Sequence, residues 1–272
     1  SIIANHLSDF SNKITLISDI GNEQKIKNLL ISNLKKNISH IHLHPSKNFK
    51  TCVKSRFIDT LSNYKLFGSY SIPNLDDKIF HLLLNRALSK NIKKNDIIIA
   101  ADYSNNFFDS DSIKKIQQSN KFICGMAQIN SNNSKFHTLN HLKNFDLVCV
   151  NQGELRSEVK DKKNSIDFIA KDFIKKNNLK FLVIIQGIDG SLLFDKKFNR
   201  YYCPSFNPKP IDKVGAGDSM LAILSVLLKN KTNPSIALMI ASLVSSNVVN
   251  NIGNKYTANR SEIERSLEFL LK

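Results

Sequence analysis

Short apolar runs alternate with segments of helical periodicity along most of the chain. Four of the runs are almost continuously hydrophobic, as expected of parallel strands that are covered on both faces. Together with an earlier run at 13–18, the expected strands are 96–102, 121–127, 146–151 and 181–187. Apolar residues at helical spacing predict helices at 22–35, 76–92, 109–119, 163–177, 217–230, 234–250 and 260–271. This alternation predicts an α/β fold whose mostly parallel central sheet is flanked by helices.

Residues 37–72 interrupt the alternation. The stretches ISHIHLH, FKTCVKSRFID and YKLFGSYSI read as three strands with no helix among them. We therefore expect a small inserted β-sheet, a lid over the active site, while residues 1–36 and 73–272 form the α/β core. No internal repeat and no long linker divides the chain, so residues 1–272 are expected to form a single domain.

Composition indicates a folded protein with reduced cysteines and no zinc site. Hydrophobic residues make up 42% of the chain, which is typical of a folded globular protein. The longest apolar runs are too short to span a bilayer. The four cysteines form no close pairs; they are Cys52, Cys124, Cys149 and Cys203. They read as reduced core residues, so we expect a cytoplasmic protein with no membrane partner.

The net charge of +16 suggests a nucleic-acid partner, but the distribution of the charge does not. Lysines are spread in short groups, such as LKKN and IKKN, at expected turns and helix ends rather than in one stripe. The chain shows no arginine-rich arm with interleaved aromatic residues. We therefore expect an anionic small molecule, rather than nucleic acid, as the partner.

The stretch IDKVGAGDSM, residues 211–220, precedes a long apolar helix and combines the features of an anion-binding loop. Gly215 and Gly217 allow a ligand to approach the backbone closely, and the following helix directs its free N–H groups and positive dipole end to the same point. Asp218 in the first turn can act as a general base towards an attacking hydroxyl. The alternative is that Asp218 is only a helix-start residue after a turn.

Two further stretches follow buried strands at the edge of the sheet where ligands of open α/β folds bind. Asn151 and Glu154 in VNQGELR can orient metal-bound water around a phosphate, or they form a helix-capping box. Gly187 and Gly190 in IIQGIDGSLLF end another strand and open a hairpin. Their alternative is an ordinary tight turn.

Histidines alternate in SHIHLH, so that His40, His42 and His44 share one strand face. No cysteine or acidic residue accompanies them, and neighbouring ligands on one face rarely complete a tetrahedron. We interpret them as a polar face of the lid sheet rather than a metal site.

Taken in order, NQGE, QGIDG and DKVGAGD resemble the signatures of the ribokinase-like (PfkB) family of carbohydrate kinases, and the resemblance covers almost the whole chain. It implies a three-layer fold and ATP with Mg²⁺ as cofactors, with a monovalent cation as a further option. It also implies Asp218 as the general base and Asp212 as the aspartate that begins the signature. The anion hole would comprise Gly215, Ala216 and Gly217, and Mg²⁺ would be placed through water by Asn151 and Glu154. ATP contacts are implied for Asn151, Gln186, Gly187, Gly190, Ser242 and Gly253.

Within that family, TCVKSRFI followed by IIAADYSNNFFD resembles kinases of heptose phosphates in lipopolysaccharide precursor synthesis. The resemblance implies a sugar-phosphate substrate, a homodimer formed through the β lid and a fused nucleotidyltransferase domain outside this chain. Lys54 and Arg56 alternate onto one strand face and can hold the phosphate of the sugar, or they are charges that protect an edge strand. Asp102 can bind sugar hydroxyls, or it only begins a loop.

The chain departs from the family pattern at several positions. Lys213 and Gln186 stand where threonine is usual, Ser242 stands near the expected adenine site, and Asn251 stands where a basic residue is common. The family's first strand and its paired glycines are expected before Ser1, so the chain reads as an N-terminally truncated fragment. An active sugar kinase is therefore weighed against a catalytically inactive relative that only binds sugar or nucleotide.

Overall fold

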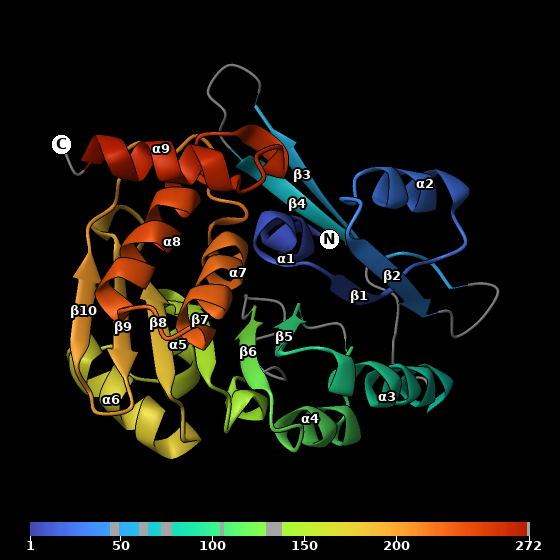
Figure 1. Ribbon diagram of the computed structural model, residues 1–272, viewed down its shortest axis with the longest axis horizontal. Helices are drawn as coiled ribbons and strands as arrows, with labels where there is room; N and C mark the ends of the chain where they lie inside the picture. The colour runs from blue at the N-terminus through green and yellow to red at the C-terminus, as the bar shows by residue number, and fades with distance from the viewer. Residues whose placement is uncertain (44–48, 60–64, 72–77, 104–105, 129–137, 271–272) are drawn as a thin grey trace.

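A six-stranded sheet forms the centre of the molecule (Figure 1). The computed structural model describes residues 1–43, 49–59, 65–71, 78–103, 106–128 and 138–270. In the strand order β10-β9-β8-β7-β6-β5, β5 to β8 are parallel, whereas β9 and β10 form an antiparallel extension. The strands are β5 (Ile97–Asp102), β6 (Phe122–Ala127), β7 (Leu147–Asn151), β8 (Phe181–Ile185), β9 (Ser191–Asp195) and β10 (Arg200–Cys203).

Helices cover both faces of this sheet, which gives three layers (Figure 1). One helical layer contains α7 (Ala216–Lys229) and α8 (Pro234–Val249), with α1 (Ile2–Leu7) and α9 (Arg260–Leu270) packed against them. The other layer comprises α3 (Lys78–Asn91), α4 (Ser110–Gln117), α5 (Gln152–Val159) and α6 (Ile166–Asn177). The expected flanked, mostly parallel α/β sheet is confirmed.

The continuous apolar runs arise because each central strand contributes to two cores. In β7, Val148 and Val150 belong to the core beneath α3 to α6, whereas Leu147 and Cys149 belong to the core beneath α7 and α8. Successive side chains of a strand point to opposite faces, so a strand covered on both sides needs apolar residues at every position.

The first strand of residues 37–72 belongs to a parallel pair of strands and not to the expected lid sheet. β1 (Ile14–Asp19) pairs in parallel with β2 (Ile38–Leu43), and α2 (Gln24–Ser32) connects them. The first of the three expected lid strands therefore belongs to a β-α-β unit, because its hydrogen-bonding partner is β1. His40 and His42 lie on β2, and His40 Nε2 lies 2.9 Å from Ser18 Oγ of β1, whereas His44 lies outside the described residues.

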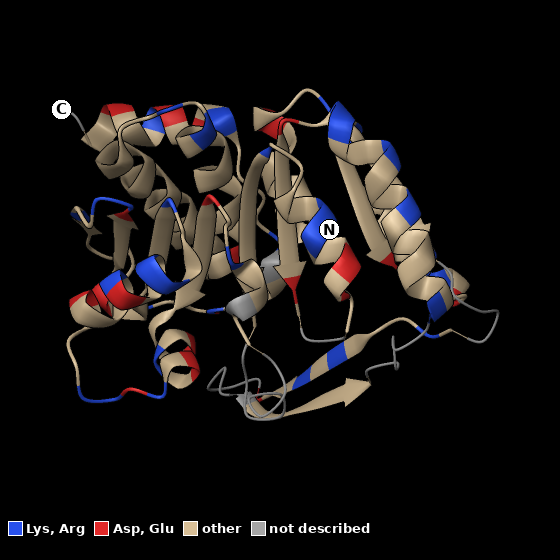
Figure 2. Cartoon of the chain, turned by 90° about the horizontal axis from the view of Figure 1, so that it is seen from below, with Lys and Arg blue, Asp and Glu red and all other residues tan. Residues whose placement is uncertain are grey.

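The lid is a two-stranded antiparallel sheet of β3 (Val53–Ile58) and β4 (Lys65–Ser71). Figure 2 shows it lying across the carboxyl ends of the sheet strands, with basic residues on one of its strands. These are Lys54 and Arg56 of β3. The lid therefore faces the edge of the sheet at which a ligand of an open α/β fold is expected.

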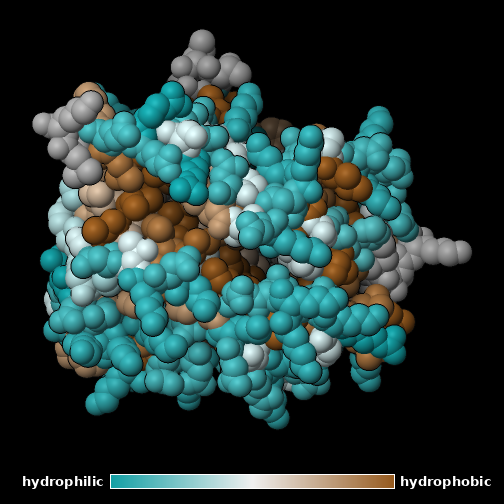
Figure 3. All heavy atoms as spheres, in the orientation of Figure 1, coloured by the Kyte–Doolittle hydropathy of each residue, from teal (hydrophilic) through white to brown (hydrophobic). Residues whose placement is uncertain are grey.

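Short 3₁₀ turns complete the chain; they are η1 (Ser8–Phe10), η2 (Ile92–Lys94), η3 (Asn140–Leu142), η4 (Gly187–Asp189) and η5 (Ile252–Asn254). All four cysteines are free, and Cys124, Cys149 and Cys203 are buried. Hydrophilic residues cover most of the face seen in Figure 3, with apolar residues gathered in a few places between them. Within the described part of the chain, we find no helix that combines the length and hydrophobicity needed to cross a membrane.

Candidate active site

A cleft with a volume of about 1350 Å³ is lined by residues of the lid strand β3 and by residues at the carboxyl ends of β5 to β8. Its walls bring together residues from segments far apart in the sequence. The predicted site residues that line it are Lys54, Arg56, Asn151, Glu154, Gln186, Gly187, Gly190, Gly215, Ala216, Gly217, Asp218 and Ser242. Asp102 and Gly253 are not among its lining residues.

The loop before α7 has the backbone geometry of an anion-binding loop. Gly215 is the N-cap of α7, with a φ of 89° that favours glycine, and no side chain caps the helix. The first intrahelical bond runs from Ser219 N to Gly215 O over 3.0 Å. The N–H groups of the first turn lack intrahelical acceptors, so they are available to an anion in the cleft.

Asp212 fixes the shape of this loop. Its Oδ1 accepts a hydrogen bond from Val214 N at 3.0 Å, and its Oδ2 accepts one from Gly253 N at 3.0 Å. Gly253 has a φ of 72°, which glycine adopts without strain. Gly253 therefore supports the loop through Asp212, whereas the predicted contact of Gly253 with ATP stays a prediction.

Asp218 lies in the first turn of α7 and is half-buried in the cleft. Tyr103 donates a hydrogen bond from Oη to Asp218 Oδ1 over 2.6 Å. Burial raises the pKa of the Asp218 carboxyl, while the hydrogen bond from Tyr103 and the charge of Lys54 act in the opposite direction. Burial therefore makes this carboxylate a stronger base than an exposed aspartate.

Lys54 extends from the lid towards the same point. Its Nζ donates to Gln128 Oε1 at 3.2 Å and lies 5.5 Å from the centroid of the Tyr103 ring. Burial lowers the pKa of Lys54, partly offset by acidic neighbours that include Asp218. Arg56, two residues along the strand, also lines the cleft and is exposed. The two cations expected on one strand face thus both reach the cleft.

Asn151 and Glu154 form the capping box that was the alternative to a metal-positioning pair. Glu154 N donates to Asn151 Oδ1 at 2.9 Å, and Asn151 N donates to Glu154 Oε2 at 3.1 Å. Both residues nevertheless line the cleft. Their amide and carboxylate oxygens are of the type that Mg²⁺ and its bound water prefer, so the pair fits the ion.

The remaining predicted nucleotide residues of the cleft come from η4 and its two flanking positions and from α8. Gln186 Nε2 donates to Gln152 Oε1 at 2.6 Å, and the hydroxyls of Ser242 and Ser191 lie 2.9 Å apart. Gly187 and Gly190 have φ values of 66° and 88° around η4, as a tight turn requires. The turn interpretation is therefore correct for both glycines, and their contact with ATP stays a prediction.

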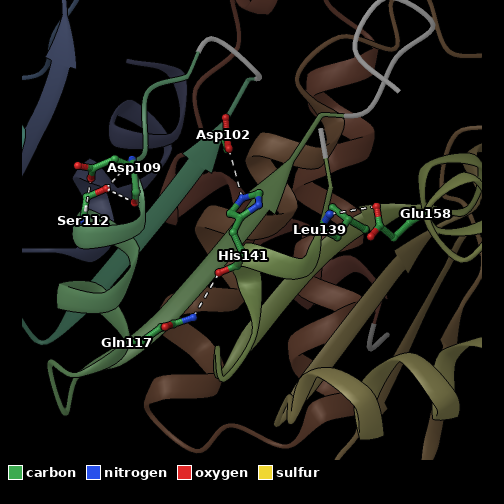
Figure 4. A network of polar contacts seen from close by, with 7 residues as sticks. All are labelled: Asp102, Asp109, Ser112, Gln117, Leu139, His141 and Glu158. Carbon is green, nitrogen blue, oxygen red and sulfur yellow. Dashed lines mark hydrogen bonds and ion pairs between the residues drawn. The ribbon is translucent and has the colours of Figure 1, made fainter. Parts of the chain in front are cut away.

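Asp102 ends β5 close to the cleft, but its carboxylate turns towards η3 (Figure 4). Its Oδ2 lies 3.2 Å from His141 Nε2, and the backbone oxygen of His141 accepts a hydrogen bond from Gln117 at 3.4 Å. The structure therefore does not bring Asp102 to the cleft wall with Lys54. Its predicted contact with sugar hydroxyls stays a prediction.

Among the polar residues of the cleft that sequence patterns missed are Asp19, Tyr103 and Gln128. Asp19 ends β1, and burial raises the pKa of its carboxyl. Its Oδ2 is buried without a hydrogen-bond partner among the described residues. All three follow or end strands, and that position at the carboxyl edge of the sheet was the signal available in the sequence. In the described part of the chain, no cluster of three histidine, cysteine or acidic residues is arranged to hold a metal ion.

Comparison with known proteins identifies relatives. Residues 3–260 match the family described as pfkB family carbohydrate kinase. The chain is 28% identical over 264 residues to the bifunctional protein HldE of Aliarcobacter butzleri, covering 94% of this chain and 53% of that protein. The chain thus spans about half the length of this relative.

Solved structures show the same fold. Ribokinase from Thermotoga maritima superposes with a TM-score of 0.74 at 18% identity, covering 98% of this chain and 85% of the ribokinase. Arabidopsis thaliana ribokinase, solved with ribose and ATP, superposes with a TM-score of 0.74 at 14% identity, covering 98% and 86%. The ribokinase-like architecture expected from the motifs is therefore confirmed.

Proposed function

The chain belongs to the pfkB family of carbohydrate kinases, and from that premise we propose that it transfers the γ-phosphate of ATP to a sugar hydroxyl. The observation that carries this proposal is the place of Asp218. It stands in the first turn of α7, directly after Gly215 to Gly217, on the wall of the cleft beneath the lid. A base and a set of amide donors therefore meet at one point, as phosphoryl transfer to an alcohol requires.

In the proposed reaction, Asp218 removes the proton of the acceptor hydroxyl, and the resulting oxygen attacks the γ-phosphorus. The bond between that phosphorus and the bridging oxygen of ADP breaks, so that ADP leaves with the electron pair and Asp218 holds the proton. The amides of residues 215–217 bind the oxygens of the transferred group. When bound, Mg²⁺ would supply positive charge that offsets the charge of the phosphates, and Asn151 and Glu154 would hold its water ligands.

The packing around Gly217 supports a ligand at this loop. A Cβ added there would meet Met126 Cε at 3.5 Å, which is an ordinary contact. The described surroundings therefore do not demand a glycine at this position. Close approach of an anion to the backbone would explain it.

The acceptor that we propose is a sugar phosphate, such as heptose 7-phosphate. Lys54 and Arg56 line the cleft from the lid and carry the positive charge that a phosphate on the sugar would need. Resemblance of the surrounding segments to heptose phosphate kinases and similarity to the Aliarcobacter butzleri protein support this choice. Asp102 is retained as a candidate for sugar hydroxyls, because it lies next to Tyr103 of the cleft.

The lid supports the further proposal of a homodimer. Its exposed apolar residues are Val53, Phe57, Ile58, Leu66, Phe67 and Tyr70. The rings of Phe57 and Phe67 stack with centroids 4.2 Å apart. A partner lid would remove this surface from water in a cytoplasmic enzyme. A fused nucleotidyltransferase domain would fit the greater length and the name of the bifunctional relative.

A second candidate is a relative that binds its ligands without transfer. It is favoured by Lys213, which lines the cleft beside the anion-binding loop where the family usually has threonine, and by Gln186. Single-turnover measurements with γ-labelled ATP and a panel of sugars and sugar phosphates separate the two. Label in the sugar product supports the kinase, whereas binding of both ligands without transfer supports the second candidate.

Asp218→Asn tests the assigned base. We expect turnover to fall by roughly a hundred- to ten-thousandfold, the usual contribution of general base catalysis, with ATP affinity nearly unchanged. Asp172→Asn is the matched control, since Asp172 pairs with Lys176 on the surface of α6. Near-normal turnover of the Asp218 variant would rule out Asp218 as the base.

A further inference from the structure

Tyr103 contacts the carboxylate that the proposed function assigns as the base. The distance of 2.6 Å between Tyr103 Oη and Asp218 Oδ1 lies in the range of a hydrogen bond from a hydroxyl to an ionised oxygen. Tyr103 follows β5, whereas Asp218 lies in the first turn of α7, so the bond ties the sheet to the helix that carries the base. None of the sequence motifs includes this contact.

Tyr103 is held from its backbone and from its ring. The preceding residue, Asp102, accepts a hydrogen bond on its backbone oxygen from Gln128 N at 2.9 Å. The carboxylate of Asp102 is in turn held near His141 (Figure 4). Lys54 lies above the ring and contacts Gln128. The hydroxyl is therefore presented to Asp218 by a supported side chain.

Charged and titratable groups from three segments surround Asp218. Tyr103 follows β5, Lys54 comes from β3, and Cys149 comes from β7. Burial raises the pKa of Asp218, and the bond from Tyr103 is the largest of the opposing effects, ahead of the charge of Lys54. Although Tyr103 is 37% exposed, desolvation together with the charge of Asp218 and their hydrogen bond raises its pKa well above the usual value, so the phenol remains a donor.

We propose that Tyr103 is the positioning residue of the base. Its hydroxyl fixes the Asp218 carboxylate through Oδ1 and keeps it ionised, which leaves Oδ2 to take the proton of the acceptor hydroxyl. Lys54 contributes to the same arrangement by contacting the Tyr103 ring while its charge remains available to the substrate. The catalytic part of this assignment rests on the proposed function, whereas the effect of Tyr103 on Asp218 does not.

Tyr103→Phe tests the proposal, because it removes the hydroxyl and keeps the ring beneath Lys54. A hydrogen bond to a charged group changes the protonation equilibrium of that group by roughly ten- to a hundredfold, which corresponds to a shift of about one to two pH units. We expect the acid limb of the kcat/KM profile to move upward by that amount, with an unchanged KM for ATP. Tyr103→Leu, which lacks both the hydroxyl and the ring, should shift the acid limb in the same direction and replaces the first variant if that variant does not fold.

The matched control is Tyr202→Phe, since Tyr202 is an exposed tyrosine of β10 that does not line the cleft. A titration of ¹³C-labelled aspartate carboxyls, assigned with Asp218→Asn, measures the same effect without catalysis. An upward shift of Asp218 in the Tyr103 variants but not in the control supports the proposal, whether or not sugar is phosphorylated. An unshifted Asp218 titration overturns it, even if the wild-type protein proves to be a kinase.

Discussion

His6 gives the structure a predicted sensitivity to acid. Its side chain is 1% exposed in α1, and its Nδ1 accepts a hydrogen bond from Ala258 N at 3.0 Å. Because Nδ1 is the acceptor, the neutral ring carries its proton on Nε2, which is buried without a hydrogen-bond partner among the described residues. A second proton would have to displace the bond from Ala258. Burial accordingly lowers the pKa of His6 to about 4.

The pH dependence of stability follows from the different pKa values of His6 in the folded and unfolded protein. In the unfolded chain the histidine pKa returns to about 6.5, so between pH 6.5 and 4 the unfolded state binds more protons than the folded state. The stability supplied by neutral His6 is therefore present above pH 6.5 and is lost as the pH falls towards 4. The difference of about 2.5 pKa units corresponds to about 3 kcal/mol of unfolding free energy when His6 is fully neutral. About 2 kcal/mol of this contribution is lost by pH 5.

Urea unfolding of the wild type and of His6→Asn at pH 7.5, 6 and 5 measures this loss. Asn offers an oxygen near the position of Nδ1 for the Ala258 N–H but does not titrate. We expect the variant to be less stable at pH 7.5 and the difference to shrink by about 2 kcal/mol at pH 5. His42→Asn, at an exposed position of β2, should retain the wild-type slope. Equal slopes for the wild type and His6→Asn would refute the argument.

Three other outcomes are expected. Lys54→Met should raise the KM of a phosphorylated sugar about tenfold or more in steady-state assays, with little change in the KM of ATP, because it removes a cation from the lid end of the cleft. Gly190→Ala should lower the free energy of unfolding by about 1–3 kcal/mol, since the φ is 88° and the new Cβ would lie 2.2 Å from Cys203 O. Gly187 has a φ of 66°, but a new Cβ there would meet nothing within 4 Å, so Gly187→Ala should lose only the smaller free energy that comes from its strained backbone. Activity should fall as the pH is lowered through the raised pKa of Asp218, and a pH profile without an acid limb would contradict that assignment.

Local patterns predicted most strands and most helices because burial on two faces leaves a direct mark on the sequence, whereas the short edge strand β10 was not predicted. Residues 147–150 are continuously apolar, and β7 does contribute alternate residues to both cores. α1 was missed because six residues are too few to establish a helical period. α5 was not predicted as a helix, although its capping box at Asn151 and Glu154 was recognised.

Pairing between strands was harder to predict than the strands themselves. The run at 38–43 was recognised as a strand, but its local pattern does not say whether its partner is β1 or β3. The contact between Tyr103 and Asp218 joins positions 115 apart in the chain, and nothing in either local segment specifies it. Strand ends predicted where the cleft lies, because the parallel topology gathers them at one edge. The contacts within the cleft needed the structure.

Asn151 and Glu154 show why helix capping and metal positioning are compatible interpretations. The reciprocal bonds of the capping box use Asn151 Oδ1 and Glu154 Oε2 to start α5 at the end of β7. The same bonds fix both side chains on the cleft wall, where a pair that places metal-bound water must be rigid. Removing either side chain would disturb the helix start as well as the cleft, so loss of activity in such a variant would not by itself assign a metal role. Glu154→Gln keeps an acceptor oxygen for the cap and removes the charge, and it therefore separates the two contributions.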